Sequence, residues 1–183
     1  MMQESDNRQD VGEYHGDPSA LVCGNRWSLD EEGILCSNGR LLLRDLAKFP
    51  KLKSVHLSSA IVDAEGVTPL LKVISLVISD REVDSQAIGN AFPNLETLVI
   101  VETDFDFERL PPLAKLRLIV VARGSPPSAS GLSRQPALES VDFVYLACKG
   151  CEQDLEGALR QLRPDIKIRA FSSEVRAPNG VGL

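Results

Sequence analysis

Apolar residues recur along this chain at fixed distances behind a proline. Pro-x-Leu or Pro-x-Ile occurs six times, beginning at Pro50, Pro69, Pro93, Pro111, Pro136 and Pro164. In the first five copies the residues two, five and seven positions after the proline are all apolar. These triplets are Leu52/Val55/Leu57, Leu71/Ile74/Leu76, Leu95/Leu98/Ile100, Leu113/Leu116/Leu118 and Leu138/Val141/Phe143. We predict that they form the core.

The spacing of the prolines indicates a repeat protein. The intervals between them are 19, 24, 18, 25 and 28 residues, a range typical of solenoids. The apolar positions five and seven of each copy alternate with outward positions, as in a short half-buried strand. Between the strands the pattern predicts helices over 84–92 and 152–162, single turns over 63–68 and 104–110, and a loop over 124–135.

The chain divides into four parts by composition. These are an acidic tail (1–20) expected to lack fixed structure without a partner, an N-terminal cap (21–49), five to six repeats with a C-terminal cap (50–171), and a second tail (172–183). In the first cap, Ser28 and Glu31 have the spacing of a capping box, and residues 40–48 predict a helix. Arg169 interrupts the apolar pattern of the last strand, as a terminal repeat often does.

These motifs resemble the units of leucine-rich repeat proteins, which follow Leu-x-x-Leu-x-Leu-x-x-Asn/Cys-x-Leu. Residues 52–57 (LKSVHL) and 95–100 (LETLVI) match the first half of that unit. Residues 49–55 (FPKLKSV) and 92–98 (FPNLETL) are similar to the irregular repeats of F-box proteins. Over residues 40–171 the resemblance implies an α/β solenoid, with a short-stranded parallel sheet on the concave face and helices or turns on the convex side.

The chain departs from the family at the position that usually carries Asn or Cys. There the proline alignment gives Ala60, Ser79, Thr103, Val121 and Leu146. An uninterrupted asparagine ladder is therefore excluded. Either the turn after each strand is stabilised in another way, or the fold is an ordinary α/β sheet whose strands begin alike.

In a solenoid of this kind, the outward positions between the core leucines carry the function. We expect a partner-binding surface made of His56, Ser75, Val77, Val99, Val101, Arg117, Ile119, Asp142 and Val144. Its apolar members predict a stripe that docks a partner, with the charged residues orienting it. Strand propensity alone is a second explanation of the stripe. A third is that the acidic tail or another copy of the chain covers it.

Charge and composition narrow the function classes. The net charge of −6 arises within residues 1–32, and the remaining residues carry 18 acids and 18 bases. We therefore expect no nucleic-acid partner. The polar N-terminus and the lack of a long apolar run predict an intracellular protein, cytoplasmic or nuclear, without a membrane span. We expect the four cysteines to be reduced thiols, because intracellular proteins rarely contain disulfides. The sequence does not predict the oligomeric state.

Catalytic and metal motifs are weak. Cys148 and Cys151 have the spacing of a thioredoxin-like redox motif at a helix start, and the alternative is a structural role. A zinc site joining this pair to Cys23 and Cys36 conflicts with their separation across the sheet. The acidic clusters 80–84 and 104–108 lack the spacing of a calcium loop. We expect no cofactor and no metal.

The sequence thus predicts a non-catalytic module that binds a protein partner through its concave sheet. By resemblance to F-box proteins, an alternative is a substrate-recognition or scaffold subunit of a larger complex, such as a ubiquitin ligase. A thiol oxidoreductase that uses Cys148 and Cys151 is the third possibility.

Overall fold

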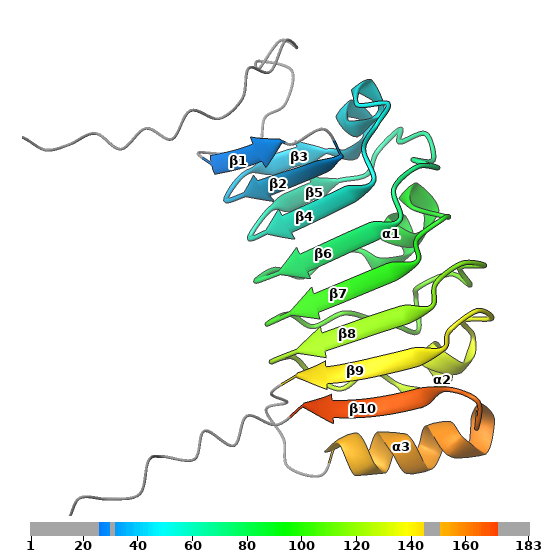
Figure 1. The fold of residues 1–183 in the computed structure, drawn as a ribbon. Helices are drawn as coiled ribbons and strands as arrows, with labels where there is room; N and C mark the ends of the chain where they lie inside the picture. The colour runs from blue at the N-terminus through cyan, green and yellow to red at the C-terminus, as the bar shows by residue number, and fades with distance from the viewer. Residues whose placement is uncertain (1–25, 30–31, 145–150, 172–183) are drawn as a thin grey trace, which may run out of the picture.

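The computed structural model describes residues 26–29, 32–144 and 151–171, which form one long sheet with a small second sheet, helices and turns behind it (Figure 1). The strands are β1 (Arg26–Leu29), β2 (Gly33–Ser37), β3 (Arg40–Leu42), β4 (Ser54–Ser58), β5 (Ile61–Asp63), β6 (Ser75–Ser79), β7 (Thr97–Val101), β8 (Leu118–Ala122), β9 (Ser140–Val144) and β10 (Lys167–Phe171). The helices are η2 (Leu43–Lys48, a 3₁₀ helix), α1 (Ser85–Ala91), α2 (Ala129–Ser133) and α3 (Cys151–Leu162).

The main sheet follows the order of the chain. Its strand order is β1-β2-β4-β6-β7-β8-β9-β10, and every neighbouring pair from β2 to β10 is parallel. Only β1, which pairs with β2, runs antiparallel among the described strands. A second, two-stranded sheet of β3 and β5 lies behind the first strands (Figure 1). The fold is thus α/β, a seven-stranded parallel sheet alternating with helices and turns, consistent with a leucine-rich-repeat-like solenoid.

Side chains on one face of the sheet and on the helices behind it form a single core. Alternate residues of β2, β4, β7 and β8 are buried, for example Leu98 and Ile100 in β7. Ile88 of α1, Leu132 of α2 and Leu155 and Leu159 of α3 belong to the same cluster. The helices therefore cover the back face, and the other face of the sheet, which we call the open face, carries the intervening residues.

Local chemistry explains where the helices begin. The carboxylate of Asp84 accepts hydrogen bonds from the amides of Gln86 and Ala87, which makes it the N-cap of α1. This confirms the helix expected over 84–92, and α3 confirms the one over 152–162. The segment 124–135, expected to be a loop, contains α2. Gly131 lets that short helix pack closely against the backbone at Phe107, because a Cβ on residue 131 would lie 2.7 Å from the carbonyl carbon of Phe107.

The strand register corrects the alignment of two repeats. Pro69 predicted Leu71 and Ile74 in the core, but Leu71 is 60% exposed and Val73, Leu76 and Ile78 are buried. Pro111 predicted Leu118 in the core and Ile119 outside, and the reverse holds: Ile119 is fully buried. The first core residues of successive parallel strands, Ile34, Val55, Leu76, Leu98, Ile119 and Val141, are then 21, 21, 22, 21 and 22 residues apart.

The N-terminal cap also differs from the prediction. The helix expected at Ser28 is wrong, because this residue lies in β1. Residues 40–48 form β3 followed by η2 instead of one helix. β2, which the sequence assigned to the cap, pairs in parallel with β4 and places Ile34 and Cys36 in the core. The repeating register therefore begins one strand before Pro50.

Main-chain hydrogen bonds repeat at the start of each strand. The carbonyl of Glu32 accepts the amides of Lys53 and Ser54 at 2.8 and 2.9 Å. The carbonyls of Lys53, Ile74, Glu96 and Arg117 each accept the corresponding two amides of the next repeat. Each repeat is thus attached to the next at the point where its strand begins.

A matching pattern follows the end of each strand. The residue after the strand has a left-handed backbone conformation and donates its amide to the carbonyl of the last residue of the next strand, over 2.9–3.1 Å. These residues, none of them glycine, are Asn38, Ser59, Asp80, Glu102 and Arg123. The turn that lacks an asparagine ladder is therefore held by main-chain bonds.

The corrected register predicts opposite effects for two adjacent residues. Ile119→Ala, which opens a cavity in the core, is expected to lower the free energy of unfolding by about 2–5 kcal/mol. Leu118→Ala, on the open face, is expected to lower it by less than about 1 kcal/mol. Urea unfolding of both variants measures this. Equal losses would contradict the register.

Candidate functional site

The open face consists of three rows of side chains that run across the strands. The middle row is Leu35, His56, Val77, Val99, Val120, Asp142 and Arg169. The row toward the strand starts is Gly33, Ser54, Ser75, Thr97, Leu118, Ser140 and Lys167. The row toward the strand ends is Ser37, Ser58, Ser79, Val101, Ala122, Val144 and Phe171.

Apolar side chains gather in the centre of this face. They belong to four neighbouring strands, β6 to β9, and each is partly exposed. The apolar patch, as we call it, consists of Val77, Val99, Val101, Leu118, Val120, Ala122 and Val144. The same outward positions of β4 hold Ser54, His56 and Ser58, so the fold itself accepts polar residues there.

An ion pair borders the patch on the side of β10. The guanidinium of Arg169 donates two hydrogen bonds to the carboxylate of Asp142, with N–O distances of 2.8 and 2.7 Å. The Asp142 side chain is only 13% exposed and that of Arg169 is 54% exposed. The arginine thus covers a carboxylate that sits next to Val120 in the row.

A histidine borders the patch on the other side. His56 lies opposite Val77 in the register and is partly buried. Burial lowers the pKa of His56 below its ordinary value of 6.5, against an opposing effect of the Asp80 carboxylate, which raises this pKa. Because the shift favours the uncharged form, this border of the patch is largely uncharged at neutral pH.

The structure places the expected site residues in three different environments. Six lie on the middle row or the row toward the strand ends: His56, Val77, Val99, Val101, Asp142 and Val144. Ser75 lies on the open face as well, in the row toward the strand starts. Arg117 precedes β8, 3.6 Å from the carboxylate of Glu139, and Ile119 lies in the core. Both misplacements follow from aligning that repeat on Pro111.

Sequence reasoning missed Leu118, Val120 and Ala122, which complete the patch on β8. A signal for them was present, because Leu116, Ile119 and Val121 also fit the spacing Leu-x-x-Leu-x-Leu. Choosing that triplet in place of the one after Pro111 puts these three residues on the open face.

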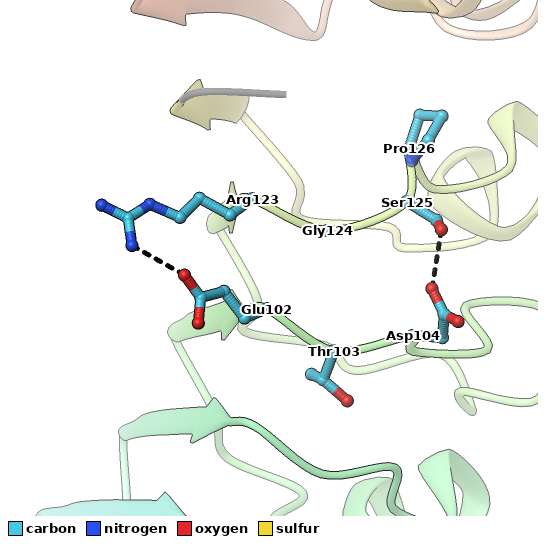
Figure 2. A pocket seen from close by; sticks show the side chains of 7 residues that line it. All are labelled: Glu102, Thr103, Asp104, Arg123, Gly124, Ser125 and Pro126. Carbon is cyan, nitrogen blue, oxygen red and sulfur yellow. Dashed lines mark hydrogen bonds and ion pairs between the residues drawn. The ribbon is translucent and has the colours of Figure 1, made fainter. Parts of the chain in front are cut away.

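A cavity of about 290 Å³ lies beyond the ends of β7 and β8 (Figure 2). The Arg123 guanidinium pairs with the Glu102 carboxylate at 2.7 Å, and the Ser125 hydroxyl donates to the Asp104 carboxylate at 2.6 Å. Gly124 is small where a Cβ would come within 3.0 Å of the Thr103 carbonyl oxygen. Since both carboxylates already have partners, we assign no catalytic role to this cavity.

The acidic clusters have structural partners as well. Asp84 caps α1, and the hydroxyls of Ser128 and Ser130 donate to Glu108 and lower its pKa. Within the described part of the chain, no group of three His, Cys, Asp or Glu residues is placed to hold a metal ion. Cys36 is buried in the core, and Cys151 begins α3. Cys23 and Cys148 lie outside the described residues.

No family model matches the chain, and no curated protein matches it. None of the helices described above is long and apolar enough to cross a membrane.

The lowered pKa of His56 predicts a loss of stability in weak acid. The unfolded chain takes up the His56 proton at a higher pH than the folded chain, so stability falls as the pH drops below about 6.5. His56→Gln is expected to reduce this loss. Urea midpoints of the wild type and the variant at about pH 7.5 and pH 5.5 measure it. Identical pH dependence of the two proteins would contradict the assignment.

The ion pair predicts that Arg169 stabilises the end of the sheet. Arg169→Ala removes the partner of the largely buried Asp142 carboxylate and is expected to cost about 1–3 kcal/mol of unfolding free energy. Lys167→Ala, an exposed residue of the same strand, is the matched control and is expected to cost less than about 0.5 kcal/mol. Chemical denaturation that finds equal effects would rule out this role.

Proposed function

We propose that this chain is a non-catalytic interaction module that binds a protein partner through the open face of its sheet. The apolar patch over β6 to β9 is the observation that carries this proposal. Removal of such a contiguous apolar surface from water favours association.

Strand propensity alone accounts poorly for the patch. Outward positions of β4 and β6 hold serines at Ser54, Ser58 and Ser75, and these strands have the same length and register as β7 and β8. The fold therefore does not require valine or leucine on this face. Their concentration on neighbouring strands is what a buried interface centre needs.

Polar residues at the two borders of the apolar patch can orient a bound partner. On the β10 side, the side chain of Arg169 is half-exposed while its guanidinium binds Asp142 through two of its five N–H groups, so further N–H groups are left for a partner. On the β4 side, His56 adds a ring that is mostly uncharged at neutral pH. An apolar centre with polar ends fits a peptide, a helix or a domain that presents an apolar ridge across the strands.

The test is affinity purification of the full chain from its native cell, followed by mass spectrometry. Val99→Asp and Val120→Asp each place a charge in the patch and are expected to abolish capture of the partner. Ile61→Asp is the matched control, because Ile61 is 52% exposed on β5 of the second sheet. Circular dichroism verifies folding of all three variants. A partner retained by both patch variants would overturn the proposal.

The same experiment separates the two alternatives. Capture of a cullin adaptor would identify the chain as a subunit of a ubiquitin ligase. An insulin-reduction assay examines the third possibility, since thiol activity abolished by Cys148→Ser would assign an enzyme in place of a binding module.

A further inference from the structure

The last strand of the main sheet, β10, has a neighbouring strand on one side only. It pairs in parallel with β9 and ends the strand order, and Figure 1 shows β10 and α3 at the same end of the molecule. Each of the other parallel strands buries at least two of its residues. In β10, by contrast, four of the five residues are exposed and the fifth is partly buried. We call the side of β10 that faces away from β9 the free edge.

The main chain of β10 determines which groups face the free edge. The amide of Lys167 donates to the carbonyl of Glu139, before β9, over 2.9 Å, so this residue turns its main chain toward β9. Successive residues of a strand direct their main-chain groups to opposite sides, so Ile168 and Ala170 direct theirs to the free edge. No hydrogen bond within the described part of the chain reaches these groups. The free edge therefore presents two N–H donors and two carbonyl acceptors spaced as in a strand ladder.

The side chains of β10 on the open face carry positive charge. Lys167 is exposed and forms no ion pair with a described residue. Arg169 uses two of its N–H groups for Asp142 and has three others. Asp165, the acid nearest to them in the sequence, is paired with Arg163. Because Asp142 balances only one of the two cations, an acidic side chain on an added strand would lie opposite an unbalanced positive charge.

The back side of β10 and the adjoining end of α3 are apolar. Ile168 packs against the core while partly exposed, and Ala170 is exposed. On α3, Leu155 and Leu159 are buried, whereas Leu162, which the helical spacing places on the same side, is 53% exposed. The apolar stripe of α3 thus extends beyond the part that the sheet covers. Apolar side chains of an added strand would find apolar contacts on this side.

A second copy of β10 fits the free edge poorly. Antiparallel pairing about Arg169 would place two guanidinium groups opposite each other. Pairing about Ile168 would place Lys167 opposite the second copy's Arg169. Like charges directly opposite each other destabilise a strand pair. The main-chain groups therefore favour a strand as the ligand, and the charges favour a strand of a different sequence.

We propose that the free edge of β10 binds an extended segment of a partner protein, which adds a strand to the sheet. The main chain of the segment pairs with Ile168 and Ala170, its acidic side chains face Lys167 and Arg169, and its apolar side chains face the back side. A segment of alternating acidic and apolar residues meets both conditions, because side chains along a strand alternate between its two faces. This site is separate from the apolar patch over β6 to β9.

Direct binding of short peptides to the full chain tests this inference. The probe is a fluorescein-labelled peptide, Gly-Val-Glu-Val-Glu-Val-Glu-Gly, whose Kd is measured by fluorescence polarisation at low ionic strength. Replacing its Glu residues by Lys reverses the charge and is expected to weaken binding at least about tenfold. Added salt is expected to weaken binding of the acidic peptide, because salt screens exposed charges.

Methylated peptides test whether the main chain carries the binding. Alternate amides of a strand point to opposite sides, so only one set of the peptide's amides can face β10. One peptide is N-methylated at its Val residues and the other at its Glu residues. One of the two is expected to bind at least about tenfold more weakly than the unmodified peptide, and the other to change its Kd less than about threefold. Equal affinities of the two methylated peptides would contradict strand addition.

Matched variants of the chain locate the binding. Ala170→Pro removes an N–H group at the free edge while the bonds to β9 remain, and it is expected to raise the Kd about tenfold or more. Ala170→Val, which keeps the N–H group, is its control. Lys167→Glu is expected to raise the Kd about fivefold, with Lys115→Glu, an exposed residue before β8, as its control. Both controls are expected to change the Kd less than about twofold, and circular dichroism verifies folding.

Two results with these variants would overturn the inference. One is binding of the acidic peptide that Ala170→Pro leaves unchanged. The other is a dimer in light scattering that Ala170→Pro dissociates, which would assign a second copy of the chain to the free edge.

The chain's own residues 172–183, which follow β10 directly, are the remaining candidate ligand. A full-length variant with Val175→Pro and Ala177→Pro tests them, because proline prevents strand pairing. If the acidic peptide bound this variant but not the wild type, the chain's own segment would be the ligand and the proposal of a partner would fail. Equal affinity of both proteins for the peptide supports an external partner.

Discussion

The fold depends on main-chain hydrogen bonds that fix each repeat to the next at both ends of its strand. One carbonyl before the strand receives two amides, and one amide after it reaches the next strand's last carbonyl. Side chains take no part, which explains why the position that usually carries asparagine tolerates Ala60, Thr103 and Gly124 after the register is corrected. This arrangement has an energetic cost, because the residue after each of five strands adopts a left-handed backbone conformation although none of these residues is glycine.

This constraint also explains how far the sequence could be interpreted. The alternation of apolar residues predicted parallel strands and a shared core, since burial on one face requires it. The prolines gave the wrong alignment in two repeats because a proline belongs to the turn, and the turn has no fixed distance to the strand. The hydrogen bonds fix the strand itself, so Leu76 and Ile119 keep their spacing from the other core residues while Pro69 and Pro111 do not.

The residues of the candidate site were likewise predicted where the alternation of apolar residues was clear and missed where it was not. Val77, Val99, Val101 and Val144 were found because they alternate with core residues in whichever alignment is chosen. The residues of β8 were missed, because a strand with apolar residues on both faces, Leu118 to Ala122, does not reveal its orientation by composition.

The five left-handed residues also form a row along one side of the sheet. Because main-chain geometry alone sets their places, their side chains follow one another at the interval between strands, about 4.8 Å. At present the row holds an amide, a hydroxyl, two carboxylates and a guanidinium, Asn38 to Arg123. Substitutions in this row change the charge along that side of the sheet, while the distance between neighbouring side chains stays the same. The side chains on this margin can therefore change without any change in the backbone that positions them.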